Sequence, residues 1–133
     1  MNSPSGDSCS QPASPTLLAA IRQFNAGTYF TCHETLEELW RVETIPLRSF
    51  YQGLLQIAVG LNHLHRGNER GAMALLNSGA KLLHPFAPQC LEIDVASLLA
   101  GVEQVLEALA AHRLEQTQAM ADRLSLRITL TKE

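Results

Sequence analysis

The sequence is short of the features that would assign a function directly. Aromatic residues make up 5% of its 133 residues, and 10 Lys and Arg against 13 Asp and Glu give a formal net charge of −3. No cluster of Lys or Arg is present, and a nucleic-acid-binding protein needs one to neutralise phosphates. No apolar run is long enough to span a bilayer. We therefore expect neither nucleic acid nor membrane as a partner, and an accessory role with RNA or DNA is the weakest hypothesis.

Cysteine is also scarce. The three cysteines are Cys9, Cys32 and Cys90, and no two of them have the CxxC spacing of a zinc ribbon. Their number and scatter do not indicate a disulfide framework either, so we expect reduced thiols in a cytoplasmic protein. The first 15 residues contain neither a basic stretch nor an apolar one, so a signal peptide is not predicted.

Hydrophobic residues are present in ordinary amount, at 46%. Most of them are Leu and Ala, which are good helix formers, and the length suits one domain. Residues 1–14 are rich in Ser and Pro, and we expect them to be disordered. The predicted helical domain spans 15–124, and the β-prone residues 125–133 are expected to form an extended tail.

Apolar residues recur at helical spacing along most of the chain. The pattern predicts helices over about 15–25, 28–43, 46–66, 68–83 and 94–111, with a sixth over 114–124 if the fifth breaks near Ala111. Asn68 and Asp94 are expected caps, and residues 84–93, which contain two prolines, are expected to form a loop. The predicted fold is all-α: a single compact bundle of five to six helices, stacked as antiparallel hairpins.

The third predicted helix is apolar almost all round, which is typical of a central, buried helix. Gly53 and Gly60 lie seven residues apart on one side of it, and each costs helix stability. We therefore expect another helix to approach closely there. Beside them Gln52, Gln56 and His63 form a polar stripe, within about 40° of one another on a helical wheel.

The second predicted helix carries the segment His33-Glu34-x-x-Glu37-Glu38-x-Trp40-Arg41. His33 and Glu37 are four residues apart, so their side chains lie on one side of the helix, close enough to share a proton or a metal ion. A wheel predicts that one set of side chains faces inward: Cys32, His33, Leu36, Leu39 and Trp40. Glu37 lies on the shoulder of that arc, and a second set is expected to point away from its centre: Glu34, Glu38 and Arg41.

One hypothesis is a polar pocket between the second and third helices that binds a divalent metal or a small polar ligand. His33, Glu37 and His63 would bind a divalent metal, zinc or iron, with an open position for water and hydrolysis. The candidate catalytic residues are His33, Glu34 and Glu37. The other residues assigned to this pocket are Trp40, Arg41, Gln52, Gln56 and Asn68. The segment is HExxE and not HExxH, in which Glu34 would be the general base, so a metalloprotease is disfavoured.

The alternative hypothesis involves no catalysis. Buried polar groups usually find hydrogen-bond partners, so His33 could bond Glu37 or Gln56 and fix the register of the two helices. The chain would then be an interaction module that self-associates through the apolar stripe of the fifth helix. Adjacent residues on a helix diverge by about 100°, which disfavours a catalytic pair of Cys32 and His33. The remaining histidines have no evident partner: His65, His84 and His112.

Two blocks of the sequence resemble a known family. The first is Phe24-Asn25-x-Gly27-x-Tyr29-Phe30-x-x-His33-Glu34-x-Leu36-Glu37-x-Leu39-Trp40-Arg41. The second is Phe50-Tyr51-Gln52-Gly53-Leu54-Leu55-Gln56-Ile57-Ala58, followed by His63, Arg66-Gly67-Asn68 and Gly71-Ala72. Over about residues 17–85 the chain resembles the bacterial, archaeal and plant family catalogued as domain of unknown function number three-hundred-and-nine.

The resemblance implies a compact helical bundle with the HExxE segment on one helix and the QGxxQ segment on the next. It implies no activity, since none is assigned to the family. Cys32 departs from the pattern, because a small residue such as Ala is expected there. The positions that match the polar signature of the family are His33, Glu34, Glu37, Trp40, Arg41, Gln52, Gln56, His63 and Asn68.

Overall fold

The computed structural model describes residues 7–44, 46–111 and 126–131. The predicted all-α bundle is confirmed, and each of the five predicted ranges exceeds the observed helix by at most one residue at either end. The helices are α1 (Pro15–Asn25), α2 (Tyr29–Val42), α3 (Leu47–His65), α4 (Glu69–Leu83) and α5 (Val95–Ala110). The predicted sixth helix over 114–124 lies outside the described residues.

Local side-chain chemistry sets the ends of these helices. Ser14 Oγ accepts a hydrogen bond from the Leu17 amide at the start of α1, and Asn68 and Asp94 cap α4 and α5 in the same way. These bonds satisfy backbone amides that have no partner within the helix. Gly27 and Gly67, with φ of +81° and +80°, form the turns after α1 and α3. The caps predicted at Asn68 and Asp94 are confirmed.

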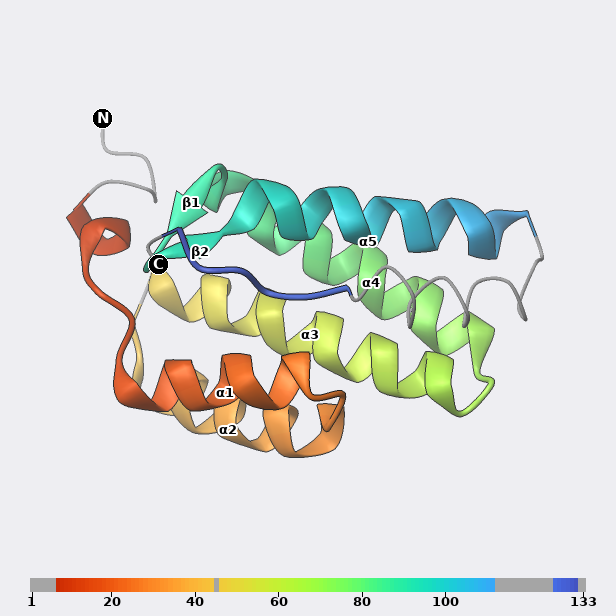
Figure 1. Ribbon diagram of the computed structural model, residues 1–133, viewed down its shortest axis with the longest axis horizontal. Coiled ribbons are helices and arrows are strands. Elements are labelled where there is room, and N and C mark those ends of the chain that lie inside the picture. The colour runs from red at the N-terminus through yellow and green to blue at the C-terminus, as the bar shows by residue number, and fades with distance from the viewer. Residues whose placement is uncertain (1–6, 45, 112–125, 132–133) are drawn as a thin grey trace.

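α3 is the central helix of the bundle. It packs against α2 on one side and against α4 on the other, while α1 covers α2 and α5 lies along α4 (Figure 1). Nine of its residues are buried, as the apolar pattern predicted: Phe50, Tyr51, Gly53, Leu54, Ile57, Ala58, Gly60, Leu61 and Leu64. The two faces of this helix therefore support two different helix pairs.

The glycines of α3 admit α4 to close range. A Cβ atom added to Gly53 would lie 3.1 Å from the carbonyl oxygen of Gly79, and one added to Gly79 would lie 2.9 Å from that of Gly53. A Cβ on Gly60 would lie 3.1 Å from Leu76. Backbone thus approaches backbone between α3 and α4, and the close approach predicted from the glycine spacing is confirmed.

The N-terminal arm is folded where the structure describes it, which corrects the prediction of disorder for that part. Residues 7–10 form a 3-10 helix, η1 (Asp7–Ser10), and Cys9 is buried. Cys9 forms a disulfide with Cys90, so the expectation of reduced thiols is wrong for this pair. Cys32 is a free, buried thiol. The spacing of the cysteines could not disclose the pair because 81 residues separate its members.

The predicted loop over 84–93 contains regular structure. A 3-10 helix, η2 (His84–Phe86), precedes an antiparallel pair of two-residue strands, β1 (Gln89–Cys90) and β2 (Ile93–Asp94). At the hairpin tip Leu91 and Glu92 have positive φ angles of 50° and 68°. Such angles are costly for residues with a Cβ, and here hydrogen bonds from both ends of the chain accompany them. The Leu91 amide donates to the Cys9 carbonyl, and the Thr131 amide donates to that of Glu92.

Residues 126–131 run extended across the bundle. Asn25 exchanges two hydrogen bonds with the backbone of Ile128, at 2.8 and 3.0 Å, and Leu130 forms a β-bridge with Ile93. Leu126 packs against Gly101 of α5. This segment therefore connects α1, α5 and the hairpin, and Ile128 is part of the core.

Most of the apolar stripe of α5 is buried in the core. Five of the residues predicted to mediate self-association are 0–1% exposed: Val95, Leu98, Val102, Val105 and Leu109. Packing against the rest of the bundle occupies these five side chains, so self-association through the whole stripe is wrong, whereas Leu99 and Leu106 of the same stripe stay partly exposed. Among the helices of the described segments, none combines the length and the hydrophobicity needed to cross a membrane.

Candidate functional site

Three ionisable side chains, His33, Glu37 and Arg41, follow one another along the outer side of α2. His33 Nε2 lies 3.9 Å from Glu37 Oε1, and Arg41 Nη2 lies 3.7 Å from Glu37 Oε2. Both distances exceed hydrogen-bonding range, so these are loose ion pairs. The side chains of His33, Glu37 and Arg41 are 28%, 37% and 65% exposed. The predicted proximity of His33 and Glu37 is confirmed, but both groups border solvent and do not lie in the core.

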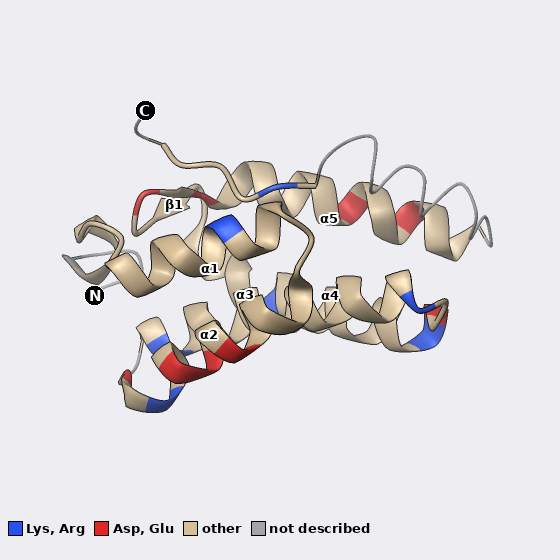
Figure 2. Ribbon diagram, turned by 60° about the horizontal axis from the view of Figure 1, so that its bottom comes forward, with Lys and Arg blue, Asp and Glu red and all other residues tan. Residues whose placement is uncertain are grey.

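Two exposed hydrophobic side chains accompany this charged row. Phe30 is 60% exposed and Val42 is 80% exposed, one near each end of α2. The ring of Phe30 packs edge-on against that of His33, with 5.9 Å between centroids. Glu34 and Glu38 are exposed between them. Figure 2 shows acidic residues at several positions along α2, so this helix presents a mainly acidic surface with an apolar group near each end.

Trp40 contacts α3 through its ring. The guanidinium carbon of Arg48 lies 4.0 Å from the Trp40 ring centroid, a cation–π arrangement. Arg48 Nε also donates a hydrogen bond of 3.2 Å to the Trp40 carbonyl oxygen, one of the last carbonyls of α2. Trp40 Nε1 is buried without a hydrogen-bond partner. Trp40 is thus a partly buried packing residue, as its place in the inward arc predicted.

His63 lies at the turn between α3 and α4. Asn68 Nδ2 is 3.1 Å from His63 Nδ1, while Asn68 Oδ1 accepts the hydrogen bond from the Gly71 amide that caps α4. A Cβ on Gly71 would lie 3.1 Å from the ring of His63, which places this ring beside the start of α4. Asn68 therefore acts as a cap and as a partner of His63.

The imidazole that reaches α2 belongs to His65. Its ring packs edge-on against that of Tyr29, with 5.3 Å between centroids. Residues two apart on a helix point about 200° apart, so His63 and His65 cannot serve the same neighbour. The prediction that His65 has no evident partner is therefore wrong. The sequence alone could not tell which of the two histidines faces α2, because it does not show which side of α3 packs against α2.

These positions do not assemble the predicted metal site. In the described ranges 7–44, 46–111 and 126–131, no group of three or more His, Cys, Asp and Glu side chains could hold a metal ion. His33 and Glu37 approach each other on α2, whereas His63 pairs with Asn68, at the start of α4. The amides do not complete a pocket either: Gln52 is half-buried, and Gln56 Oε1 is buried with no hydrogen-bond partner. The structure thus brings together two of the three proposed ligands.

Burial also decides the chemistry of two nucleophilic groups. The Cys32 side chain is fully buried, which raises the pKa of its thiol from 9.0 to about 12. Burial, with a smaller contribution from the charge of Glu43, raises the pKa of Tyr51 from 10.0 to about 12. Both groups stay neutral near pH 7. Cys32 is therefore an inert core thiol, in agreement with the argument against a Cys32–His33 pair.

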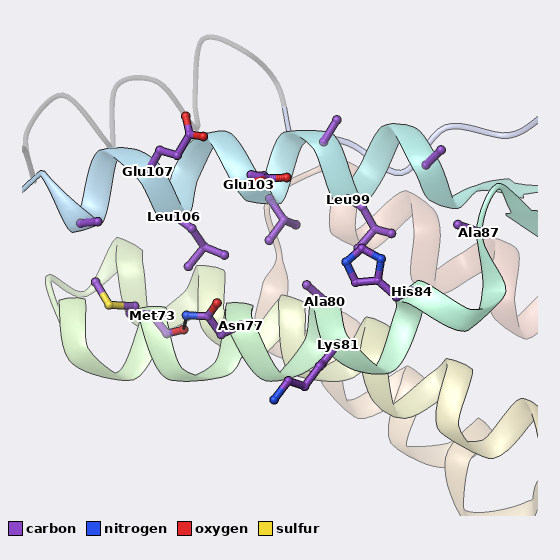
Figure 3. A pocket seen from close by; sticks show the side chains of 14 residues that line it. Met73, Asn77, Ala80, Lys81, His84, Ala87, Leu99, Glu103, Leu106 and Glu107 are labelled. Atoms are coloured by element: carbon purple, nitrogen blue, oxygen red, sulfur yellow. Dashed lines mark hydrogen bonds between the residues drawn. The ribbon is translucent and has the colours of Figure 1, made fainter.

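A groove between α4 and α5 is the feature that the sequence did not indicate. It has a volume of about 760 Å³, and Figure 3 shows Leu99 and Leu106 of α5 directed toward α4. Its charged and polar lining residues come from both helices and η2: Asn77, Lys81, His84, Glu103 and Glu107. The sequence holds one weak signal for this groove: Glu103 and Glu107 lie four residues apart on a helix that has several exposed alanines.

The fold and these surfaces define a small helical-bundle domain with a polar and apolar outer face on α2. Residues 17–75 match the family described as "Domain of unknown function (DUF309)", so this part of the chain is similar to that family. The resemblance predicted from the two sequence blocks is confirmed over that range.

A curated relative is similarly uncharacterised. The chain is 35% identical over 82 residues to the "Uncharacterized protein YpuF" of Bacillus subtilis (strain 168). The match covers 59% of this chain and 47% of YpuF, so the chain spans about half the length of the curated relative it matches. Neither comparison assigns an activity, and the function has to be argued from the surfaces.

Proposed function

We propose that this protein is a non-catalytic docking module whose outer α2 face binds a basic, partly apolar segment of a partner protein. The observation that carries the proposal is the position of Phe30 and Val42. These are the large hydrophobic side chains that are exposed among the described residues, and both belong to α2. Each of these side chains offers a partner an apolar contact beside polar groups of the same helix.

The charges of α2 define the chemistry of the partner. Glu34, Glu37 and Glu38 lie between the two apolar side chains, and Arg41 is the cation that accompanies them. On a helical wheel Phe30, Glu34, Glu37 and Arg41 fall within about 60° of one another. A segment that lies along this arc would meet Phe30 and the carboxylates, while Val42, about 120° from Phe30 on the same wheel, lies beside the arc. Charge complementarity therefore favours a segment with Lys or Arg next to a hydrophobic residue.

The same geometry favours docking over a metal site. The His33–Glu37 pair supplies two ligands, whereas zinc sites in proteins use three or four. Arg41 lies 3.7 Å from the second oxygen of Glu37, and its positive charge opposes a divalent cation there. A basic segment can instead pair with Glu34 and Glu38, which have no neighbouring cation within ion-pair range among the described side chains.

A designed peptide can test the proposal without a known partner. The probe is an amphipathic helical peptide of Leu and Lys, titrated into ¹⁵N-labelled protein, and the control peptide has Glu in place of Lys. We expect the amide shifts to change over 29–42 with the basic peptide and not with the acidic one. Added salt should weaken the binding, because exposed charges are screened.

Matched variants locate the contact. Phe30→Ser and the pair Glu34→Gln with Glu38→Gln should each weaken peptide binding by at least about fivefold, since anchors and complementary charges both contribute to binding. The control pair, Glu103→Gln with Glu107→Gln, removes two carboxylates from α5 and should leave binding unchanged. Shifts spread equally over α5, or binding that resists both changes on α2, would contradict the proposal.

A further inference from the structure

The groove between α4 and α5 has an apolar floor. The floor consists of four side chains that pack against the core and stay partly exposed to solvent: Met73, Ala80, Leu99 and Leu106. Its length follows from the helices on either side, 15 and 16 residues long. At 1.5 Å per residue this gives about 22–24 Å. The floor is therefore long enough to receive a helix (Figure 3).

The two rims of the groove carry opposite charges. Lys81 on α4 is exposed, and His84 follows it at the end of the same rim. Glu103 and Glu107 are exposed on the α5 rim. An occupant that matches this arrangement must present an acidic edge to α4 and a cationic edge to α5. A second copy of the same surface carries both edges, because its α5 rim is acidic and its α4 rim is cationic.

The solvent side of α5 next to the groove is built from small side chains. Ala96, Ala100 and Ala110 line the groove and are exposed. Their size lets the backbone of another helix approach α5 more closely than Leu or Met would. The apolar floor, the opposed rims and the small side chains are three separate features of one surface.

We propose that a second copy of this chain occupies the groove. A two-fold axis that runs along the groove places α4 of each copy over α5 of the other. Lys81 of one copy then faces Glu103 of the second, and the symmetry forms this pair twice. The apolar floors meet between the pairs. A dimer so formed leaves both α2 faces free, because α3 lies between α2 and the α4–α5 pair (Figure 1).

The area of the surface predicts the strength of the dimer. Two helices about 23 Å long and about 10 Å apart give a footprint of roughly 450 Å² per copy. Stable dimers bury about 800 Å² per copy or more, so this dimer should be weak and in rapid exchange. We expect a dissociation constant in the range of tens to hundreds of micromolar, and the measurements must reach that concentration.

Charge reversal tests the proposal by sedimentation velocity and light scattering between about 10 µM and 1 mM. Lys81→Glu and Glu103→Lys should each raise the dissociation constant at least about tenfold, because each places like charges opposite one another twice. The double variant restores both pairs with reversed sign and should return to within about threefold of the original protein. Arg70→Glu, which reverses an exposed charge of α4 outside the groove, is the control and should change little.

Circular dichroism of each variant checks that the fold is retained. A protein that stays monomeric at 1 mM overturns the proposal, and so does a dimer that both single reversals leave intact. Failure of the double variant to recover, with the fold intact, also overturns it. If the monomer instead binds 8-anilinonaphthalene-1-sulfonate and Leu106→Ser removes that binding, the groove belongs to a small apolar molecule. None of these outcomes bears on peptide binding at α2, which is a separate measurement.

Discussion

The two sides of α3 are built in different ways. Toward α4, backbone meets backbone: Gly53 and Gly79 face each other with no room for a side chain between them. Toward α2, side chains fill the contact, with Arg48 over the ring of Trp40 and His65 against Tyr29. One interface therefore depends on the absence of side chains, and the other depends on which side chains are present.

The difference separates a rigid contact from one that side chains define. A helix pair held at close range by glycines has one fixed spacing, since packed interiors resist even a single added methyl group. On the other side of α3, Trp40 and Arg48 make the contact, and the outer half of α2 is exposed to solvent. That half bears His33, Glu37 and Phe30. The α4 side fixes the scaffold, and the α2 side presents the surface that we assign to docking.

Gly79→Val should give the largest effect. A Cβ at Gly79 already lies 2.8 Å from Ile57 and 2.9 Å from the Gly53 carbonyl oxygen, and Val adds two methyl groups. Overpacking against backbone should lower the free energy of unfolding by about 3 kcal/mol or more. Urea titration followed by circular dichroism measures this. Ser78→Val introduces the same β-branched residue at the neighbouring exposed position and should cost less than about 1 kcal/mol. Equal losses would refute the close α3–α4 contact.

Alkaline pH should lower the free energy of unfolding through two buried groups, Cys32 on α2 and Tyr51 on α3. The pKa of Cys32 is about 12 in the folded protein and 9.0 when exposed, so below pH 9 the thiol is neutral in both states and stability is complete. Between pH 9 and 12 the unfolded chain loses the proton first, and the free energy of unfolding should fall by about 1.4 kcal/mol per pH unit. Tyr51 adds a similar fall above pH 10.

Substitutions assign this pH dependence. Cys32→Ala and Tyr51→Phe should each flatten the decline, measured by urea titration from pH 7 to 11. Leu36→Val is the control, because it weakens the same packing without a titratable group and should lower stability by the same amount at every pH. An unchanged slope in both test variants would mean that neither group is held neutral by the fold.

Arg48→Met should have an intermediate effect. The change keeps the apolar stem but removes the charge above Trp40 and the hydrogen bond to the Trp40 carbonyl oxygen. A cation–π contact and one hydrogen bond together are worth about 1–2 kcal/mol. Arg41→Met is the matched change on the exposed side of α2, and we expect it to cost less than about 0.5 kcal/mol. The difference between the two melting temperatures measures how far the α2 contact depends on side chains.

The fold was predictable because its signals are local. Helical spacing, caps at Asn68 and Asp94, and glycine spacing on α3 all act within a few turns of the chain. The hairpin and the N-terminal segment were not predictable in this way. Leu91 and Glu92 adopt positive φ without Gly or Asn, and the hydrogen bonds at this tip come from Cys9 and Thr131. No pattern near Leu91 announces a partner 82 residues away in the sequence.

The candidate site was predictable only along one helix. The i, i+4 spacing of His33 and Glu37 is a local rule, and their side chains do approach each other. Whether His63 joins them depends on the rotation of α3 relative to α2, which packing decides. The structure turns His65 and Arg48 toward α2 and leaves His63 with Asn68. The α4–α5 groove, formed by helices with no polar motif, required the tertiary structure.

The smallest predicted effect separates a structural role of the charged row from a docking role. His33→Ala and Glu37→Gln remove pairs longer than 3.5 Å whose side chains are 28–65% exposed. Such pairs contribute a few tenths of a kcal/mol, so each variant should change the free energy of unfolding by less than about 0.5 kcal/mol. If the row fixed the register of α2 against α3, the loss would instead approach that of Arg48→Met. Urea titrations of these variants beside Arg48→Met therefore decide whether the α2 face supports the fold or serves a partner.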